Sequence, residues 1–324
     1  MERITLNRRG FLLAAAVSAG AVPVIKNESF ADTNDAGIPL RKLGRHDEKV
    51  TMLALGGHHL GRITDANGKK DMKASIRLTR MAIDRGITFL DNAWCYHDGY
   101  AEELMGNALK DGYRKKVFLM TKVHGRNKQG AMAHLEESLK RFHTDMIDLW
   151  QFHDLRQEDP DKIFAANGAI EAAVEARKAG KIRYIGYTGH NNYEIHRRML
   201  TDFDFEWDTV QMPINVLDPH YRSFLNNIVP VLVDRGIAPI AMKTMAAGRL
   251  LETRTVTVEQ GLHYVWSQPV ATLVSGIASE EHLEYQIRAA KNFTPLSVAE
   301  QEAYLKKTRD FALKGKYEDY KAKV

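Results

Sequence analysis

The stretch Ala74-Ser-Ile-Arg-Leu-Thr-Arg-Met-Ala-Ile-Asp-Arg-Gly-Ile-Thr-Phe-Leu-Asp91 decides the fold of this chain. Residues 74–84 have the apolar spacing of an amphipathic helix, and the part that starts at Ile87 is a short apolar run typical of a buried strand. Gly86 separates the two, and a glycine can take the left-handed conformation that ends a helix without a steric cost. The tetrapeptide Asp-Arg-Gly-Ile recurs at 234–237 in the same setting. The pattern predicts a helix followed by a strand, repeated along the chain.

Outward from this stretch, short apolar runs alternate with helical patterns from residue 51 onward. Eight runs begin near Thr51, Ile87, Val117, Met146, Ile182, Thr209, Ile237 and Ala271, at intervals of 27 to 36 residues. Further helical patterns cover 131–142, 169–179 and 224–234. Eight strand–helix units of this length predict an α/β fold, a closed (β/α)8 TIM barrel.

The domain boundaries follow from the same pattern. Length alone suggests two domains at roughly 150 residues each, but residues 51–293 contain no Pro/Ser/Gly-rich linker, so we expect one barrel over 38–293. Residues 38–50 are expected to form a small hairpin that closes the barrel floor. The segment 294–324 is expected to hold a C-terminal helix, which packs outside the barrel or over its mouth, and a tail whose last ten residues are frayed.

The first 31 residues have the composition of a targeting segment. Arg8 and Arg9 precede Phe11-Leu12, and the sixteen residues 10–25 carry no charge. That length is too short to span a bilayer, which requires about 20 apolar residues. Ser29-Phe30-Ala31 is a small-x-small site of the kind that a signal peptidase cuts. The segment resembles a twin-arginine export signal, which predicts export to the periplasm by the twin-arginine translocation machinery and no stable membrane anchor. A buried N-terminal helix is the alternative.

Composition and charge exclude several classes of protein. The chain has 324 residues, of which 44% are hydrophobic, and these values are typical of a globular protein and not of a collagen-like or low-complexity chain. A single cysteine excludes an internal disulfide. Removing the leader takes away four basic and two acidic residues and lowers the net charge from +5 to +3. The longest basic cluster, 114–116, is short, so we expect no nucleic-acid partner.

In a barrel of this kind, the active site forms at the carboxyl ends of the strands. Four residues there, Asp91, Tyr96, Lys122 and His153, form a set that can donate a proton. A buried Lys122 would be held charged by Asp91, and its charge is expected to lower the pKa of Tyr96 toward neutrality. Such a phenol can protonate a developing alkoxide, while His153 orients the carbonyl oxygen.

These four positions resemble the aldo-keto reductase superfamily. The segment Phe89-Leu-Asp-Asn-Ala-Trp-Cys-Tyr96 is similar to the family's Asp-x-Ala-x-x-Tyr pattern, Thr121-Lys122 to its lysine strand, and Gln151-Phe-His153-Asp154 to its histidine strand. The similarity runs from about residue 40 to about residue 293. The resemblance implies a monomeric, nicotinamide-dependent oxidoreductase that passes hydride between the cofactor and a small aldehyde or ketone, or its alcohol. Tyr96 would be the general acid and base, Lys122 and Asp91 would tune it, and His153 would orient the substrate.

The resemblance also implies residues that bind the cofactor. They are Gly56, Thr188, Gly189, Gln211, Met242, Lys243, Gly248, Arg249, Gly276, Ser279, His282 and Gln286. Three depart from the common pattern: Gly189 stands where many members have Asn, Gly276 where many have Lys, and His282 where many have Arg. Because an arginine fork binds a 2′-phosphate better than a mostly neutral histidine, the choice between NADP and NAD stays open. The chain has no Gly-x-Gly, so a Rossmann fingerprint is absent.

Two other functions remain as alternatives. Histidines lie at five of the strand ends or in the loops after them. His58 and His59 share the first of these positions, and the others are His97, His124, His153 and His190. Such a cluster suits a metal-dependent barrel hydrolase, but no His-x-His pair follows the first strand and Lys122 would repel a cation, so we predict no metal ligands. The second alternative is a non-catalytic barrel that senses nucleotide. Cys95, beside the proposed acid, is interpreted as an unreactive wall residue.

Overall fold

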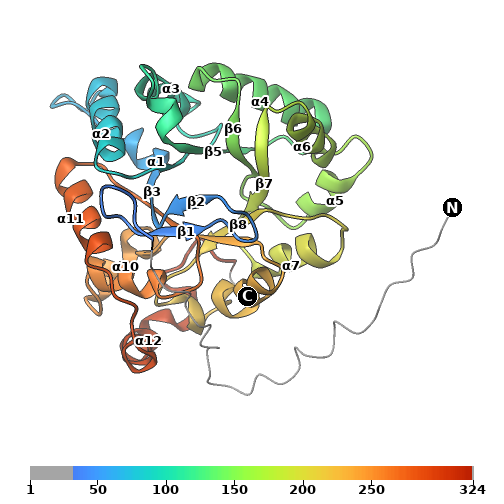
Figure 1. Cartoon of the computed structure of the whole chain (residues 1–324). Coiled ribbons are helices and arrows are strands. Elements are labelled where there is room, and N and C mark those ends of the chain that lie inside the picture. Colours follow the sequence, from blue (N-terminus) through green and yellow to red (C-terminus); the bar gives the residue numbers. More distant parts are fainter. Residues whose placement is uncertain (1–31, 323–324) are drawn as a thin grey trace.

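The computed structural model describes residues 32–322 of the chain. Eight parallel strands close into a barrel in the order β10-β3-β4-β5-β6-β7-β8-β9, which Figure 1 shows from the side of the β1–β2 hairpin. The strands are β3 (Leu53–Gly56), β4 (Phe89–Asp91), β5 (Phe118–Val123), β6 (Ile147–Phe152), β7 (Ile182–Thr188), β8 (Thr209–Pro213), β9 (Ala238–Met242) and β10 (Thr272–Ser275). Each begins no more than two residues after its predicted start. The predicted (β/α)8 barrel is therefore confirmed.

Helices surround the barrel (Figure 1). They are α1 (Gly57–Leu60), α2 (Met72–Asp84), α3 (Tyr100–Ala108), α4 (Lys128–Phe142), α5 (Asp159–Phe164), α6 (Ala169–Lys178), α7 (Tyr193–Thr201), α8 (Phe224–Asn227), α9 (Val229–Asp234), α10 (Val258–Trp266), α11 (Glu280–Lys291) and α12 (Val298–Ala312), with 3-10 helices η2 (Tyr113–Lys116), η3 (Asp218–His220), η4 (Ala246–Thr253) and η5 (Leu313–Gly315). The single helix predicted over 224–234 is wrong, because the chain divides it into α8 and α9 at Ile228. Pro230 lies in the first turn of α9, where its missing N–H is tolerated, and it cannot continue a helix from α8.

The junction around Gly86 shows why helix and strand alternate. Asp71 caps α2, since its side chain accepts a hydrogen bond from the Ala74 N–H at 2.8 Å. After α2, Gly86 has a φ of +100°, and a Cβ atom there would lie 2.4 Å from the Cβ of Ala36. Glycine avoids both the backbone strain and this clash, so the chain can reverse directly into β4. Gly236, in the repeated tetrapeptide, also has a positive φ.

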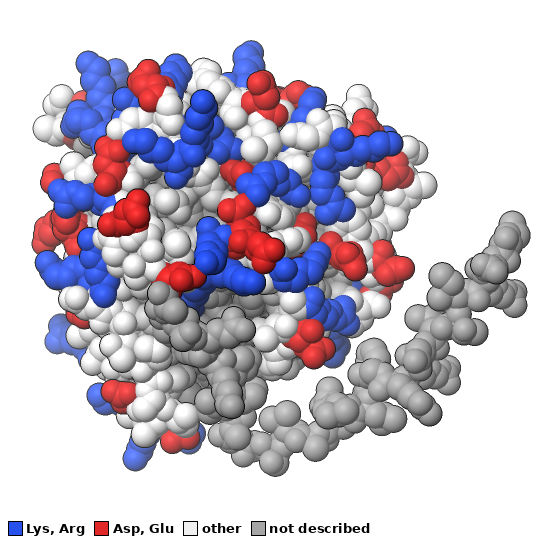
Figure 2. Space-filling view, in the orientation of Figure 1, with Lys and Arg blue, Asp and Glu red and all other residues white. Residues whose placement is uncertain are grey.

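A small antiparallel hairpin closes the amino-terminal end of the barrel, as predicted. Its strands, β1 (Leu40–Lys42) and β2 (Lys49–Thr51), pair with Leu40 opposite Thr51. Leu43 and Val50 are fully buried in one cluster with Phe89 and Phe118 of the barrel. Burial of a side chain of this size stabilises the fold by roughly 1.5–3 kcal/mol. On the hairpin side, basic and acidic side chains are interspersed (Figure 2).

The C-terminal segment packs across the carboxyl ends of β7 and β8. Helix α12 begins with a capping box formed by Ser297 and Glu300. Farther along, the N–H of Ala322 donates to the carbonyl of Asn191 at 2.7 Å. The prediction that the last ten residues fray is wrong for 315–322. Lys321 is only 2% exposed, because its ammonium group pairs with buried carboxylates.

The predicted leader, residues 1–31, lies outside the described residues, and its boundary stays a prediction. Within 32–322, no helix is both long enough and apolar enough to cross a membrane.

Candidate active site

The four predicted catalytic residues lie at the carboxyl ends of three neighbouring strands. Asp91 is the last residue of β4, Lys122 is the fifth of six residues in β5, and His153 follows β6 directly. Tyr96 lies in the loop after β4, where the N–H of Trp94 donates to the carbonyl of Lys122 at 3.0 Å. The barrel thus brings together residues that are up to 62 positions apart in the sequence.

Lys122 and Asp91 form a buried ion pair. Their side chains are 1% and 4% exposed. The ammonium group of Lys122 donates to the Asp91 carboxylate, and it also donates to the carbonyl of Asn92 at 2.6 Å. Burial raises the pKa of Asp91, and Lys122 offsets part of this effect. One carboxylate and one carbonyl oxygen therefore hold the lysine in one position, with its remaining proton available to Tyr96.

Tyr96 is poised beside this pair. Its hydroxyl oxygen lies 3.5 Å from Lys122 Nζ, and its ring meets the ring of His153 edge to face at 5.6 Å. The predicted lowering of the Tyr96 pKa is wrong for this structure. Burial raises the pKa of Tyr96 well above its usual range, and the Asp91 carboxylate raises it further. The phenol is therefore protonated at neutral pH, which is the form that a proton donor needs.

His153 is held by two side chains that the sequence reasoning did not include in the site. Its Nδ1 lies 2.8 Å from Nε2 of His124 and 3.6 Å from Sγ of Cys95. Burial lowers the pKa of His153 well below its usual range, and Lys122 lowers it further, so the ring is neutral. With Nδ1 engaged, the other nitrogen, Nε2, is the one left for a substrate oxygen. The signal for these partners was their position, since His124 follows β5 directly and Cys95 lies in the loop after β4.

Two glutamines have buried acceptor atoms without partners at predicted cofactor positions. Gln211 lies in β8 opposite Thr188, the last residue of β7. Its Oε1 is buried and has no hydrogen-bond partner, and the same is true of Oε1 of Gln286 in α11. A carboxamide or an adenine amino group would satisfy such an acceptor. Both residues therefore fit a nicotinamide dinucleotide.

Gly189 departs from the family's common pattern for a steric reason. It follows Thr188 directly, and a Cβ atom on it would lie 2.9 Å from Nε2 of His196. His196 is 1% exposed, so the ring has little room to move. The space that an asparagine side chain would need is thus occupied by a histidine ring.

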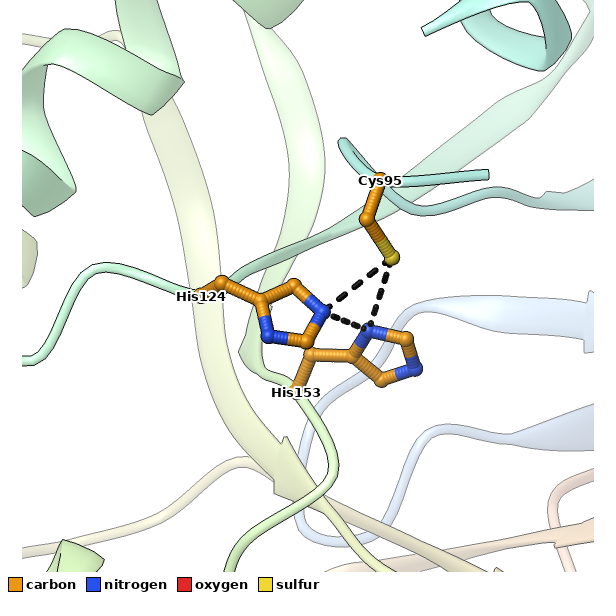
Figure 3. A group of neighbouring side chains, drawn as sticks. All are labelled: Cys95, His124 and His153. Atoms are coloured by element: carbon orange, nitrogen blue, oxygen red, sulfur yellow. Dashed lines mark hydrogen bonds between the residues drawn. The ribbon is translucent and has the colours of Figure 1, made fainter. Parts of the chain in front are cut away.

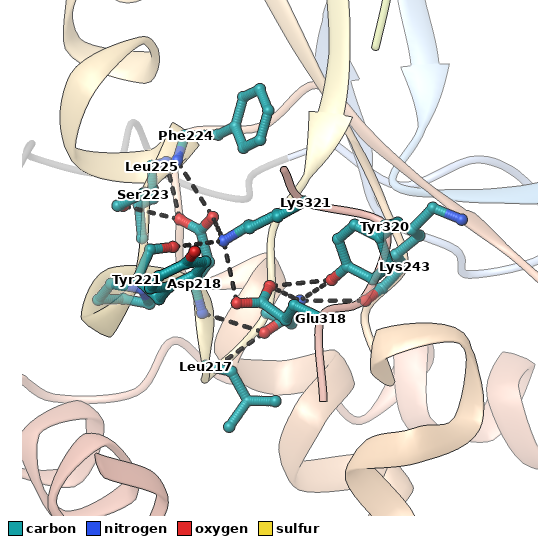
Figure 4. Close-up of polar contacts among 12 residues, drawn as sticks. Leu217, Asp218, Tyr221, Ser223, Phe224, Leu225, Lys243, Glu318, Tyr320 and Lys321 are labelled. Atoms are coloured by element: carbon teal, nitrogen blue, oxygen red, sulfur yellow. Dashed lines mark hydrogen bonds and ion pairs between the residues drawn. The ribbon is translucent and has the colours of Figure 1, made fainter. Parts of the chain in front are cut away.

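The C-terminal tail contacts two of the predicted cofactor residues. Lys243 follows β9 with a φ of +57°, and its Nζ lies 5.0 Å from the ring centre of Tyr320. Arg249, in η4 beside Gly248, pairs with Asp319 at 2.9 Å. Figure 4 shows Tyr320, Lys243 and the neighbouring Glu318 in one polar network. Sequence reasoning missed these contacts, because nothing in the local pattern of the tail indicates which strand end it covers.

The remaining predicted positions lie around the end of β10. Gly56 ends β3, and a Cβ atom on it would lie 2.9 Å from the carbonyl of Ser275. A Cβ atom on Gly276 would lie 2.5 Å from the ring of His59. Ser279 caps α11 by accepting from the N–H of His282, whose side chain is exposed. Met242 is the half-buried last residue of β9, one position before Lys243.

Comparisons with known proteins agree with this geometry. Residues 52–261 match the Aldo/keto reductase family. The chain is 32% identical over 194 residues to an aldo-keto reductase of Bacillus subtilis, a match that covers 56% of this chain and 55% of that protein. It is 29% identical over 232 residues to L-galactose dehydrogenase of Arabidopsis thaliana, covering 66% of this chain and 68% of that protein. The holo structure of an aldo-keto reductase from Bacillus halodurans has a TM-score of 0.70 at 25% identity, covering 83% of this chain and 96% of that one.

Proposed function

The chain belongs to the aldo/keto reductase family, and from its site we propose that it transfers hydride between a nicotinamide cofactor and a small aldehyde or ketone, with Tyr96 as the proton donor. One observation carries the role of Tyr96. Its hydroxyl lies 3.5 Å from Lys122 Nζ, which is itself fixed by Asp91, at adjacent strand ends beside His153.

The side chains divide the reaction between them. When bound, the reduced cofactor supplies a hydride to the carbonyl carbon. His153 donates from Nε2 to the carbonyl oxygen and fixes its orientation. Tyr96 then gives its hydroxyl proton to the same oxygen, which becomes the alcohol. The ammonium group of Lys122 stabilises the phenolate that remains until solvent returns a proton. Oxidation of the alcohol runs through the same positions in reverse.

Thr188, Gln211 and Gln286 are the residues that would hold the cofactor's amide and adenine groups. Gln211 and Gln286 each offer an unpartnered buried oxygen. Lys243 and Arg249 would face the pyrophosphate, where the C-terminal tail already contacts both side chains. The alternatives of a metal-dependent hydrolase and a nucleotide-sensing barrel are not supported, since the relatives are named as reductases or dehydrogenases.

Substitution of Tyr96 by Phe tests the proposed acid. Loss of a positioned general acid typically slows turnover by about 10²- to 10⁴-fold, which corresponds to about 2.7–5.4 kcal/mol of barrier. We expect this loss with a panel of small aldehydes, while NADH or NADPH binding, followed by cofactor fluorescence, stays near normal. Tyr113→Phe is the matched control, because the Tyr113 hydroxyl contacts Asp84 outside the site. Unchanged turnover in Tyr96→Phe would refute the assignment.

We also propose that the protein is exported to the periplasm through the twin-arginine pathway and acts there as a monomer. The paired Arg8 and Arg9 support this proposal. Because this pathway moves folded proteins and the periplasm supplies no free nicotinamide pool, we infer that the cofactor is loaded before export and dissociates slowly. A variant with Lys in place of both Arg8 and Arg9 should remain in the cytoplasm. Periplasmic protein purified without bound nucleotide, or rapid loss of nucleotide on dilution, would contradict cofactor retention.

A further inference from the structure

Three side chains converge at the ends of neighbouring strands, and the proposed reaction uses only one of them directly. Cys95 lies in the loop after β4, His124 follows β5 and His153 follows β6. Cys95 Sγ lies 3.1 Å from His124 Nε2 and 3.6 Å from His153 Nδ1, and the two nitrogens are 2.8 Å apart. Figure 3 shows these three atoms facing one another. All three side chains are half-buried, so solvent and small ions still reach them.

We propose that Cys95, His124 and His153 bind one transition-metal ion of the Zn²⁺ type through Sγ, Nε2 and Nδ1. These atoms all lie within 4.8 Å of one another. A thiolate with two imidazoles is a donor set that Zn²⁺ prefers.

The size of the triangle fits a tetrahedral ion. With Zn–S of about 2.3 Å and Zn–N of about 2.05 Å, the edges of a tetrahedral site are about 3.6 Å between sulfur and nitrogen and about 3.3 Å between two nitrogens. The distance from Cys95 Sγ to His153 Nδ1 is already 3.6 Å. The other two edges must open by about 0.5 Å, which small side-chain rotations provide. Three protein ligands leave a fourth position for water.

The two cations near the cluster, Lys122 and Arg126, are each paired with a carboxylate. The ammonium group of Lys122 is directed at Asp91 and at the Asn92 carbonyl, and Arg126 pairs with Asp159 at 3.0 Å. Binding requires no change in the number of protons on either imidazole. His153 keeps its proton on Nε2, while the proton that His124 Nε2 shares with His153 Nδ1 moves to the outer nitrogen of His124, Nδ1. The thiol of Cys95 releases its proton to solvent. The bound ion adds one net positive charge to the site.

Metal binding would fix the tautomer of His153. A metal on Nδ1 leaves the ring proton on Nε2, the nitrogen that points away from the cluster in Figure 3. His153 would then be held as a donor toward the substrate oxygen. This consequence rests on the proposed reductase function, whereas the binding of the ion itself does not.

Titration of the full chain with Co²⁺ tests the site, because Co²⁺ replaces Zn²⁺ in tetrahedral sites and reports a bound thiolate by absorption in the near ultraviolet. After treatment with a chelator, the chain is expected to bind one Co²⁺ with this thiolate band, and added Zn²⁺ is expected to displace it. Cys95→Ser should abolish the band. Cys95→Ser and His124→Asn should each weaken Zn²⁺ binding by more than about 100-fold, since loss of a mere outer-sphere partner already costs about 10- to 100-fold.

His97→Asn is the matched control. His97 lies two residues from Cys95 and has a φ of +53°, which asparagine tolerates, and its Nε2 contacts the carbonyl of His58 instead of the cluster. This variant should bind Co²⁺ like the parent chain. The proposal would be overturned if the chain bound no Co²⁺ or bound it without the thiolate band. It would also be overturned if His97→Asn lost as much metal affinity as Cys95→Ser and His124→Asn. Absence of reductase turnover in a chain that still shows the band would instead refute the proposed function alone.

Discussion

Lys321→Met removes the ammonium group that Asp218 and Glu318 share in the buried C-terminal tail. Lys321 Nζ lies 2.7 Å from Asp218 Oδ1 and 3.0 Å from Glu318 Oε2, and the three side chains are 0–1% exposed (Figure 4). Methionine has a similar length and fills the same space. The substitution therefore isolates the loss of charge from a loss of packing.

The structure sets the size of the effect. Breaking a buried ion pair by removing one partner costs about 3–5 kcal/mol, because the remaining charge is left unpaired. Asp218 keeps hydrogen bonds from Ser223, Phe224 and Leu225, and these bonds limit the part of the cost that comes from its unpaired charge. We therefore expect a loss of about 3 kcal/mol. At about 2.1 cal/mol/K for each of roughly 290 folded residues, this loss lowers the Tm by about 5 °C.

Calorimetry at pH 7 and pH 5 is the assay. Burial raises the pKa of Glu318. An acid whose folded-state pKa is raised binds a proton more tightly in the folded chain, so the fold is stabilised at low pH and loses this stability as pH rises through the raised pKa. Lys321 lowers the pKa of Glu318, so Lys321→Met raises that pKa further and the carboxyl group takes up a proton more readily in the folded variant. The loss of stability in Lys321→Met should therefore be smaller at pH 5 than at pH 7. Lys306→Met, on the exposed surface of α12, is the control. A loss below about 1 kcal/mol, or one equal to the control, would refute the reasoning.

Three further outcomes follow from the described residues. Burial lowers the pKa of His196 to about 3, so in acid the folded chain binds fewer protons at this residue than the unfolded chain does. Stability should fall as pH drops from about 6.5 toward 3, by about 2 kcal/mol at pH 5, and His196→Gln should remove this part of the slope in urea unfolding. Gly189→Asn should lower the Tm, and adding His196→Ala should restore part of it, because the clash is with that ring. The exposed Glu280 and Glu281 begin α11 beside His282. Because these carboxylates would repel a 2′-phosphate, NADH should bind better than NADPH by about 1 kcal/mol, roughly fivefold. Glu281→Lys should reduce the ratio of the two dissociation constants in a fluorescence titration.

The sequence was enough to predict that Asp91, Tyr96, Lys122 and His153 lie together in one site. In a parallel barrel every strand ends at the same face, so the residues that follow successive strands become neighbours without any further information. The same rule placed His124 and Cys95 at this face. It did not show that their donor atoms meet at Nδ1 of His153, because that contact depends on side-chain rotamers.

The sequence by itself determined the alternation of helix and strand and the residues at each strand end, since hydrophobic periodicity and glycine positions are local properties. Tertiary structure alone decided the direction of the Tyr96 pKa shift, because burial of the phenol raises its pKa and the Asp91 carboxylate raises it further. It also decided the place of the tail, where Lys321 meets Asp218 across 103 positions of the chain. Desolvation and contacts between distant residues depend on how the whole chain packs, and no local pattern contains them.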